Sequence, residues 1–457
     1  MVRQGFEEVV TNSFASYGFN AEAPVTYVFS AEMFVENSDL TPLEEHFDEF
    51  IVGLTEWQPE MTSTGVVTPD MIEITATDEL GFRKAVNNLF VRNLWRDSLP
   101  IEPPTEDLVN WILTGTDMAP DDLVSSEGGI KPRGGIARVR DVAVALAMAG
   151  GRPEYLPVTI ACVKGIAEPT AGTQSWNTTT CSIFPVFVVN GPMVREIRLG
   201  SGYGLLGADP MHPAGHTIGR AIRFILQNLG GATVGAGTMS IFGINRGTNT
   251  VIAEDEEGLP ETWTTLAEDR GFTRDQNVVT LTWANGISNI LWDFGDSEAN
   301  HRCLNGMAGQ IKAPNNNRYA VLSACQNPKN LPTGVSLFPR SFAKALQDVD
   351  GYSKSDVKKY LWEHAMITHE DLESWKSQFV LEDYVKAYTQ PNGMIPVCPD
   401  PEQLTVVVAG GDQGGHGCWL QSVCFGEMQS VVAEKPAKWD DLLLDAEIDF
   451  GPIPAAH

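Results

Sequence analysis

The stretch that decides the fold is IFPVFVVNGP, at residues 183–192. Its first seven residues are apolar, without the alternation that a strand with one solvent-facing side would show. A strand buried on both faces has this pattern, and such strands are typical of parallel sheets. The residues Asn190, Gly191 and Pro192 that follow favour a turn. The stretch therefore predicts a core strand that ends in polar residues.

Strands and helices alternate on both sides of this run. Further strands are predicted at 66–76, 278–283, 319–324 and 404–409, and helices at 78–94, 105–113, 137–149, 158–166 and 215–229. Asp78 and Thr105 are predicted N-caps, as is Ser353 within a helical stretch at 341–388, where Thr368 and Asp371 form a capping box. The alternation predicts an α/β fold with a mostly parallel sheet and flanking helices.

The length of 457 residues is too great for one small core. We expect an N-terminal α/β region at 1–103, a central α/β domain at 104–340, a helical insertion at 341–395 and a C-terminal segment at 396–457 that packs on the core. The order of proline turn, strand and helix occurs at 66–95 and again at 396–424. This repetition suggests two pseudo-symmetric lobes, and a chance similarity explains it equally well.

Charge and composition exclude several classes of protein. The formal net charge is -28, which disfavours nucleic acid, whose phosphates need a basic surface, and anionic membrane. The seven cysteines include no C-x-x-C pair, so neither a disulfide framework nor a zinc ribbon is predicted. The first ten residues contain acids where a signal peptide is apolar. We expect a cytoplasmic protein without a resident cofactor, and the sequence leaves open whether it binds a metal.

The glycine-rich stretch GGDQGGHG, at residues 410–417, is the first candidate site. It follows a predicted strand and precedes a short helix predicted from Cys418, so its backbone N–H groups could hold an anion or an oxyanion. The spacing matches neither G-x-G-x-x-G nor the P-loop. Alternatively, the glycines only turn a tight corner.

Reactive side chains accompany these glycines. His416 is the predicted acid or base, and Cys418 the predicted nucleophile or thiol, favoured as a thiolate near a helix N-terminus. Asp412 is the third catalytic candidate. The residues predicted to contact substrate are Gly411, Gly414, Gly415, Asn190, Arg195 and Arg220. For Arg220, an ion pair within the protein is the competing interpretation.

Two histidines offer a different chemistry. His212 and His216 are four residues apart, a spacing that can bind one metal when both lie on one helix face. Pro213 is predicted to begin the helix, which leaves His212 outside it. His301 and Cys303 have the order of a nucleophile pair, and no neighbouring residue supports that role.

Residues 406–419 (VVVAGGDQGGHGCW) resemble the signature region of a bacterial selenoprotein-like family named for its Sec-Gly-Ser-Cys motif. Residues 95–101, 103–105, 149–158 and 189–192 resemble larger uncharacterised bacterial proteins related to that family. Gln413 stands where the resemblance implies selenocysteine, and His416 where it implies cysteine. The redox pair is therefore absent, and the resemblance implies no reaction for this chain.

These observations favour an enzyme that acts on a small, anionic or carbonyl-bearing metabolite through the glycine-rich loop. The alternatives are a metal-dependent enzyme that uses His212 and His216, and a non-catalytic subunit or ligand-binding protein. The expected partner is a small-molecule substrate, and the chain could form a homo-oligomer or bind a partner subunit.

Overall fold

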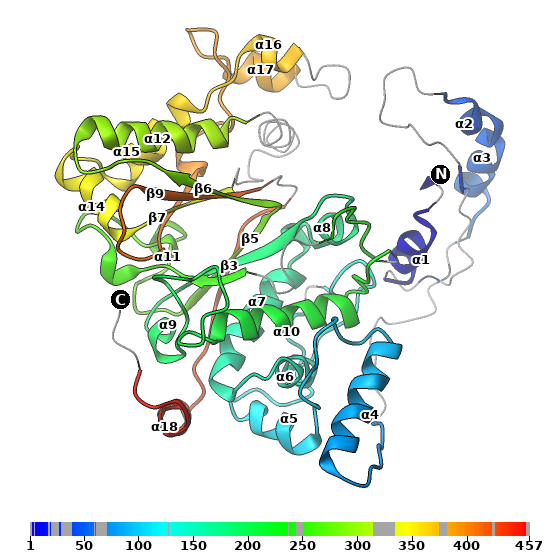
Figure 1. The fold of residues 1–457 in the computed structure, drawn as a ribbon. Coiled ribbons are helices and arrows are strands. Elements are labelled where there is room, and N and C mark those ends of the chain that lie inside the picture. Colours follow the sequence, from blue (N-terminus) through cyan, green and yellow to red (C-terminus); the bar gives the residue numbers. More distant parts are fainter. Residues whose placement is uncertain are drawn as a thin grey trace.

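The computed structural model describes residues 2–3, 5–16, 19, 27–28, 39–58, 60, 71–126, 128–235, 237–243, 250–313, 334–373, 382–422 and 426–453. The architecture is α/β, with two four-stranded sheets and helices around them (Figure 1). The predicted strand at 319–324 and the first part of the one at 66–76 lie outside the described residues.

Both sheets are mixed, so the prediction of a mostly parallel sheet was wrong. The first sheet has the order β10-β5-β3-β4 and contains β3 (Phe184–Asn190), β4 (Thr250–Ala253), β5 (Val278–Ala284) and β10 (Gln429–Val432). The second has the order β6-β9-β7-β8 and contains β6 (Gly286–Leu291), β7 (Gly334–Phe338), β8 (Thr405–Val408) and β9 (His416–Gln421). In each sheet one pairing is parallel, β3 with β4 or β7 with β8, and the other two pairings are antiparallel.

The two sheets pack face to face, and this explains the apolar run in β3. Phe184, Val186 and Val188 belong to an apolar cluster shared with Leu337 of the second sheet. Phe187 and Val189, which alternate with them, pack against helices on the outer side. All seven residues of β3 are buried. Burial on both faces therefore results from the layering and does not require parallel neighbours, which is where the sequence interpretation failed.

The chain exchanges strands between the sheets. After β3, β4 and β5 it passes to the second sheet with β6, and after β7, β8 and β9 it returns to the first with β10. The predicted central and C-terminal segments thus contribute strands to both sheets. The two sheets have the same order of parallel and antiparallel pairings. This repetition does not come from residues 66–95 and 396–424, the segments that suggested two lobes. Residues 71–76 form no strand in the described chain, and Cys418 lies in β9, where a helix was predicted.

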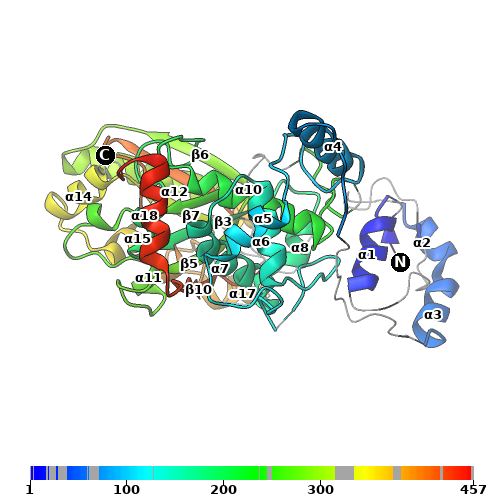
Figure 2. The ribbon, with the colours of Figure 1, turned by 90° about the horizontal axis from the view of Figure 1, so that it is seen from below.

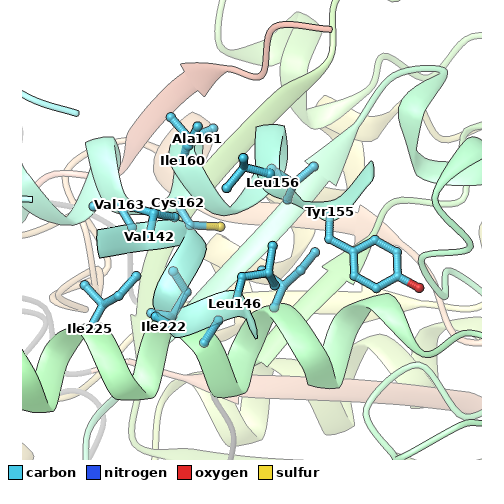
Figure 3. Packing of buried hydrophobic residues seen from close by; sticks show 14 of the residues in the cluster. Val142, Leu146, Tyr155, Leu156, Ile160, Ala161, Cys162, Val163, Ile222 and Ile225 are labelled. Atoms are coloured by element: carbon cyan, nitrogen blue, oxygen red, sulfur yellow. The ribbon is translucent and has the colours of Figure 1, made fainter. Parts of the chain in front are cut away.

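Helices lie in layers outside the first sheet (Figure 1). They include α5 (Glu106–Leu113), α6 (Val139–Met148), α7 (Leu156–Ala167), α10 (Ala214–Asn228) and α18 (Trp439–Phe450). Of these, α7 and α10 lie against its strands and the others are packed further out. Figure 3 shows Leu146 of α6 and Cys162 of α7 beside Ile222 of α10. The helices predicted at 105–113, 137–149, 158–166 and 215–229 are confirmed. So are the caps, because Thr105 caps α5 and Asp78 caps α4 (Glu79–Arg92).

The outer face of the second sheet packs against α12 (Ser297–Ile311), α14 (Arg340–Asp348) and α15 (Lys354–His364). The predicted helical stretch is confirmed by α14, α15, α16 (His369–Glu373) and α17 (Glu382–Tyr388). Ser353 caps α15, and Thr368 and Asp371 exchange the bonds of a capping box. Among the described residues, no helix has the length and apolarity to cross a membrane.

Shorter elements complete the fold. The N-terminal ones, which Figures 1 and 2 show at one side of the sheets, are β1 (Val2–Arg3), α1 (Glu7–Ser16), β2 (Tyr27–Val28), α2 (Thr41–Glu45) and α3 (Phe47–Thr55). The others are α8 (Thr173–Thr178), α9 (Met193–Glu196), α11 (Leu266–Asp269) and the 3-10 helices η1 (Pro153–Tyr155), η2 (Pro169–Ala171), η3 (Glu256–Gly258) and η4 (Pro401–Gln403).

Candidate functional site

The carboxyl ends of β4 and β8 meet at one place, although they belong to different sheets. The Asp255 amide donates to the Val408 carbonyl at 2.8 Å. The segment 200–206 lies across both ends, because the Ala253 amide donates to the Gly200 carbonyl and the Gly410 amide to the Ser201 carbonyl. We call this place the strand-end region: residues 200–206, 253–256 and 409–418, with Asn190.

The glycines of the β8–β9 loop make tight turns and close contacts. Gly411 and Gly415 have φ of +82° and +75°, values that favour glycine. A Cβ on Gly411 would lie 2.7 Å from the Tyr203 ring, and one on Gly415 would lie 2.0 Å from the Trp292 carbonyl oxygen. Gly414 packs against the Phe294 ring in the same way. Since β9 follows the loop, the helix that was predicted from Cys418 was wrong.

β9 decides how the catalytic candidates are placed. His416 is its first residue and Cys418 its third, so alternation along the strand puts both side chains on one face. Cys418 packs with the apolar cluster between the sheets, which also includes Leu205 and Leu206. Both candidates are partly buried, whereas Asp412 is exposed. Cys418 therefore lacks the helix N-terminus that was expected to favour its thiolate.

Other predicted residues have partners within the protein. Arg220 makes two bonds of 2.8 Å to the Asp97 carboxylate, so the competing interpretation of an internal ion pair is confirmed. The exposed Arg195 guanidinium lies 3.6 Å from Glu257. Both arginines lie outside the strand-end region as defined.

His212 and His301 both have side-chain partners within the protein. His212 precedes α10, as predicted, and its Nδ1 lies 2.5 Å from an oxygen of Asp209. Within the described ranges, no group of three His, Cys, Asp or Glu residues could hold a metal. His301 lies 3.0 Å from the Tyr352 hydroxyl, and burial raises the pKa of Cys303 to about 12. Cys303 is therefore a core residue.

Acidic residues that the sequence analysis missed follow β4. The Asn190 amide donates to Glu254 at 2.7 Å and to Glu256 at 2.9 Å. Asp255 accepts two bonds of 2.8 Å from Arg340, the residue that begins α14 in the second layer. The two sheets are thus joined by an ion pair at their ends. The signal in the sequence was the position of Glu254 and Asp255 directly after an apolar run.

Glu254 connects this end to a buried chain of charges. Burial raises the pKa of Glu254, whose Oε1 lies 4.0 Å from Lys354 Nζ. The Nζ of Lys354 lies 2.8 Å from Asp269, which also lies 3.4 Å from Lys358. Burial alone would raise the pKa of Asp269, but the two lysine charges hold it below its ordinary value. The spacing of four residues between the lysines on α15 was the signal for this network.

The strand-end region therefore combines a histidine, a thiol and a buried carboxyl group with raised pKa, at the junction of two sheets. Residues with perturbed pKa values gather at functional sites and also in structural ion networks. Comparison with protein-family models, with curated proteins and with solved structures found no match for this chain.

Proposed function

We propose that the chain is an enzyme acting on a small, anionic or carbonyl-bearing metabolite at the strand-end region. The observation that supports the proposal is the placement of His416 and Cys418 on one face of β9, where Cys418 packs with the apolar cluster that includes Leu205 and Leu206. A histidine can exchange protons near neutral pH. A thiol beside a base is a common arrangement for covalent catalysis.

In this proposal each element has a separate role. His416 is the acid or base, Cys418 is the nucleophile or thiol, and Asp412 contacts ligand from the exposed side of the loop. The loop glycines allow a ligand to approach the backbone, as Tyr203 already does at Gly411. The Asn190 amide donates a hydrogen bond to the buried Glu254 and thereby fixes the position of this carboxyl group. Arg220 is bound to Asp97 and is left out of the substrate-binding set.

Alkylation of Cys418 tests the proposal. The rate of its reaction with iodoacetamide should be measured by peptide mass spectrometry in the wild type and in His416→Ala. We expect His416→Ala to slow the reaction at Cys418 and to leave Cys181 unchanged, since Cys181 is also a partly buried thiol but lies outside the region. A panel of small carboxylates, keto acids and phosphate esters should contain a compound that protects Cys418.

A second function is a ligand-binding protein or subunit without catalysis. It is favoured by the close packing of the loop glycines against Tyr203, Phe294 and Trp292, because these contacts occupy space beside the glycines. An unreactive Cys418 that no compound protects would support this function and contradict the enzyme. Light scattering of the purified chain would show whether it forms the proposed homo-oligomer or needs a partner subunit.

A further inference from the structure

A cavity of about 440 Å³ lies at the opposite end of β8 from the glycine-rich loop. Leu404 and Thr405, at the start of that strand, form part of its wall. The rest of the wall comes from α11 and the residue after it, from α15, from η4 and from the residues before β10. The volume falls within the range of small-molecule sites. This cavity shares no lining residue with the strand-end region, and the Leu266 amide, which donates to Glu254 at 2.6 Å, connects the two places.

Most charges in the wall neutralise one another. Lys358 is buried, and its Nζ lies 3.4 Å from Asp269 and 3.2 Å from Glu402. Asp269 is also paired with Lys354, which lies outside the wall, so the wall residues Lys358, Asp269 and Glu402 all have partners of opposite charge. A ligand gains little from charges that are already paired.

Two further charges in the wall, Arg270 and Glu427, form no ion pair within the described ranges, although the negative charge of Glu427 partly offsets the lowering of the Arg270 pKa by burial. Arg270 donates through Nε to the Ser430 hydroxyl at 3.2 Å and through Nη2 to the Met428 carbonyl at 2.8 Å. These bonds orient the guanidinium and leave other N–H groups available. The backbone of Glu427 is held by a bond of 2.7 Å from its amide to the Thr170 carbonyl.

The remaining wall is apolar where it adjoins these charges. Leu266, Leu404 and Met428 also line this cavity. A fitting ligand therefore carries one anionic group, one cationic group and an apolar part. A free amino acid has these three features in one small molecule.

We infer that this cavity binds a zwitterionic small molecule of the amino-acid class. Its carboxylate lies on Arg270, its ammonium group on Glu427, and its side chain on Leu266 and Leu404. Guanidinium and carboxylate groups form charge-assisted hydrogen bonds, which are stronger than neutral ones. The binding site goes beyond the proposed enzyme function and does not depend on it.

The test begins with thermal unfolding of the full chain in the presence of each of the twenty L-amino acids. At least one should raise the midpoint, and calorimetry should then give its Kd. The corresponding amine without a carboxylate, and the corresponding acid without an amine, should bind at least tenfold more weakly. Failure of all twenty amino acids, or equal binding of a singly charged analogue, would overturn the inference.

Variants locate the binding. Arg270→Gln and Glu427→Gln should each weaken the Kd about tenfold, which is the loss of one charge-assisted hydrogen bond. Arg274→Gln is the matched control, because Arg274 pairs with Glu268 and lies outside the cavity wall. Its Kd should equal that of the wild type. If Arg270→Gln and Glu427→Gln bind the amino acid as tightly as Arg274→Gln does, the amino acid binds elsewhere and the inference is wrong.

Discussion

The two sheets have one strand plan but different residues where their parallel strands end. In the first sheet, β3 ends at Asn190 and β4 is followed by Glu254 and Asp255. In the second, β7 is followed by Pro339, and β8 is followed by Ala409, Gly410 and Gly411. The shared topology brings the two ends together, and the side chains decide what each end does. One end supplies buried charge, and the other supplies room for close approach.

The largest effect should come from the ion pair that joins the two ends. Asp255→Ala leaves Arg340 without its carboxylate, and removing one partner of a buried pair costs several kcal/mol. Because part of the Arg340 side chain reaches solvent, we expect a loss of about 3 kcal/mol in the free energy of unfolding. Chemical denaturation measures it. A loss no greater than that caused by breaking the exposed Arg83–Glu102 pair would show that the sheet ends are not joined by this contact.

The glycine end should be sensitive to added volume. Gly415→Ala places a methyl group against the Trp292 carbonyl and also strains a backbone with φ of +75°. Gly393→Ala is the matched control, since Gly393 has φ of +80° and open space around its Cβ. We expect losses of about 2 kcal/mol for Gly415 and about 1 kcal/mol for Gly393. Equal losses would mean that the close approach at Gly415 is unimportant.

The acidic end should make the stability of the protein depend on pH through Glu254. Burial raises the pKa of Glu254 above its ordinary value of 4.5. The folded protein therefore holds this proton more tightly than the unfolded chain, and the stability that Glu254 contributes below pH 4.5 is lost as the pH rises through the raised pKa. The slope is at most about 1.4 kcal/mol per pH unit.

Glu254→Gln removes this titration. In denaturation measured from pH 4.5 upward, we expect the wild type to lose stability relative to the variant until the pH passes the raised pKa. A difference between the two proteins that stays constant with pH would show that Glu254 has the same pKa in the folded and unfolded states.

The smallest effect on stability should come from His416→Ala, within about 1 kcal/mol, because this first residue of β9 is only partly buried. Trp419, on the opposite face of the same strand, is buried, and Trp419→Ala should cost about 3 kcal/mol or more. A large loss for His416→Ala with unchanged alkylation of Cys418 would make His416 a structural residue and would count against the enzyme.

Local signals in the sequence predicted many of the longer helices, although α12 and α18 were missed. Asp78, Thr105 and Ser353 cap the helices they were expected to cap, since a cap depends on a side chain and backbone groups within the same few residues. The apolar run at 183–189 likewise predicted a strand buried on both faces. It did not reveal what covers those faces, and the parallel sheet was inferred from burial alone.

At the candidate site, too, the sequence predicted local features and missed contacts between distant segments. The sequence indicated the glycine-rich loop, His416 and Cys418, but the helix expected from Cys418 is a strand, because its residues pair with β6 and β7. Glu254, Asp255 and Arg340 were missed, since two of them meet a partner 85 residues away and nothing local indicates such a contact.

The sequence by itself determined the caps, the buried strand in the first sheet and the acidic balance of charge, because these depend on neighbouring residues and on composition. Only the tertiary structure decided the strand directions, the exchange of β6 and β10 between the sheets, and the meeting of the acidic and glycine-rich ends. Those features depend on hydrogen bonds and ion pairs between segments far apart in the chain. Such contacts stabilise the fold only when both segments are in place.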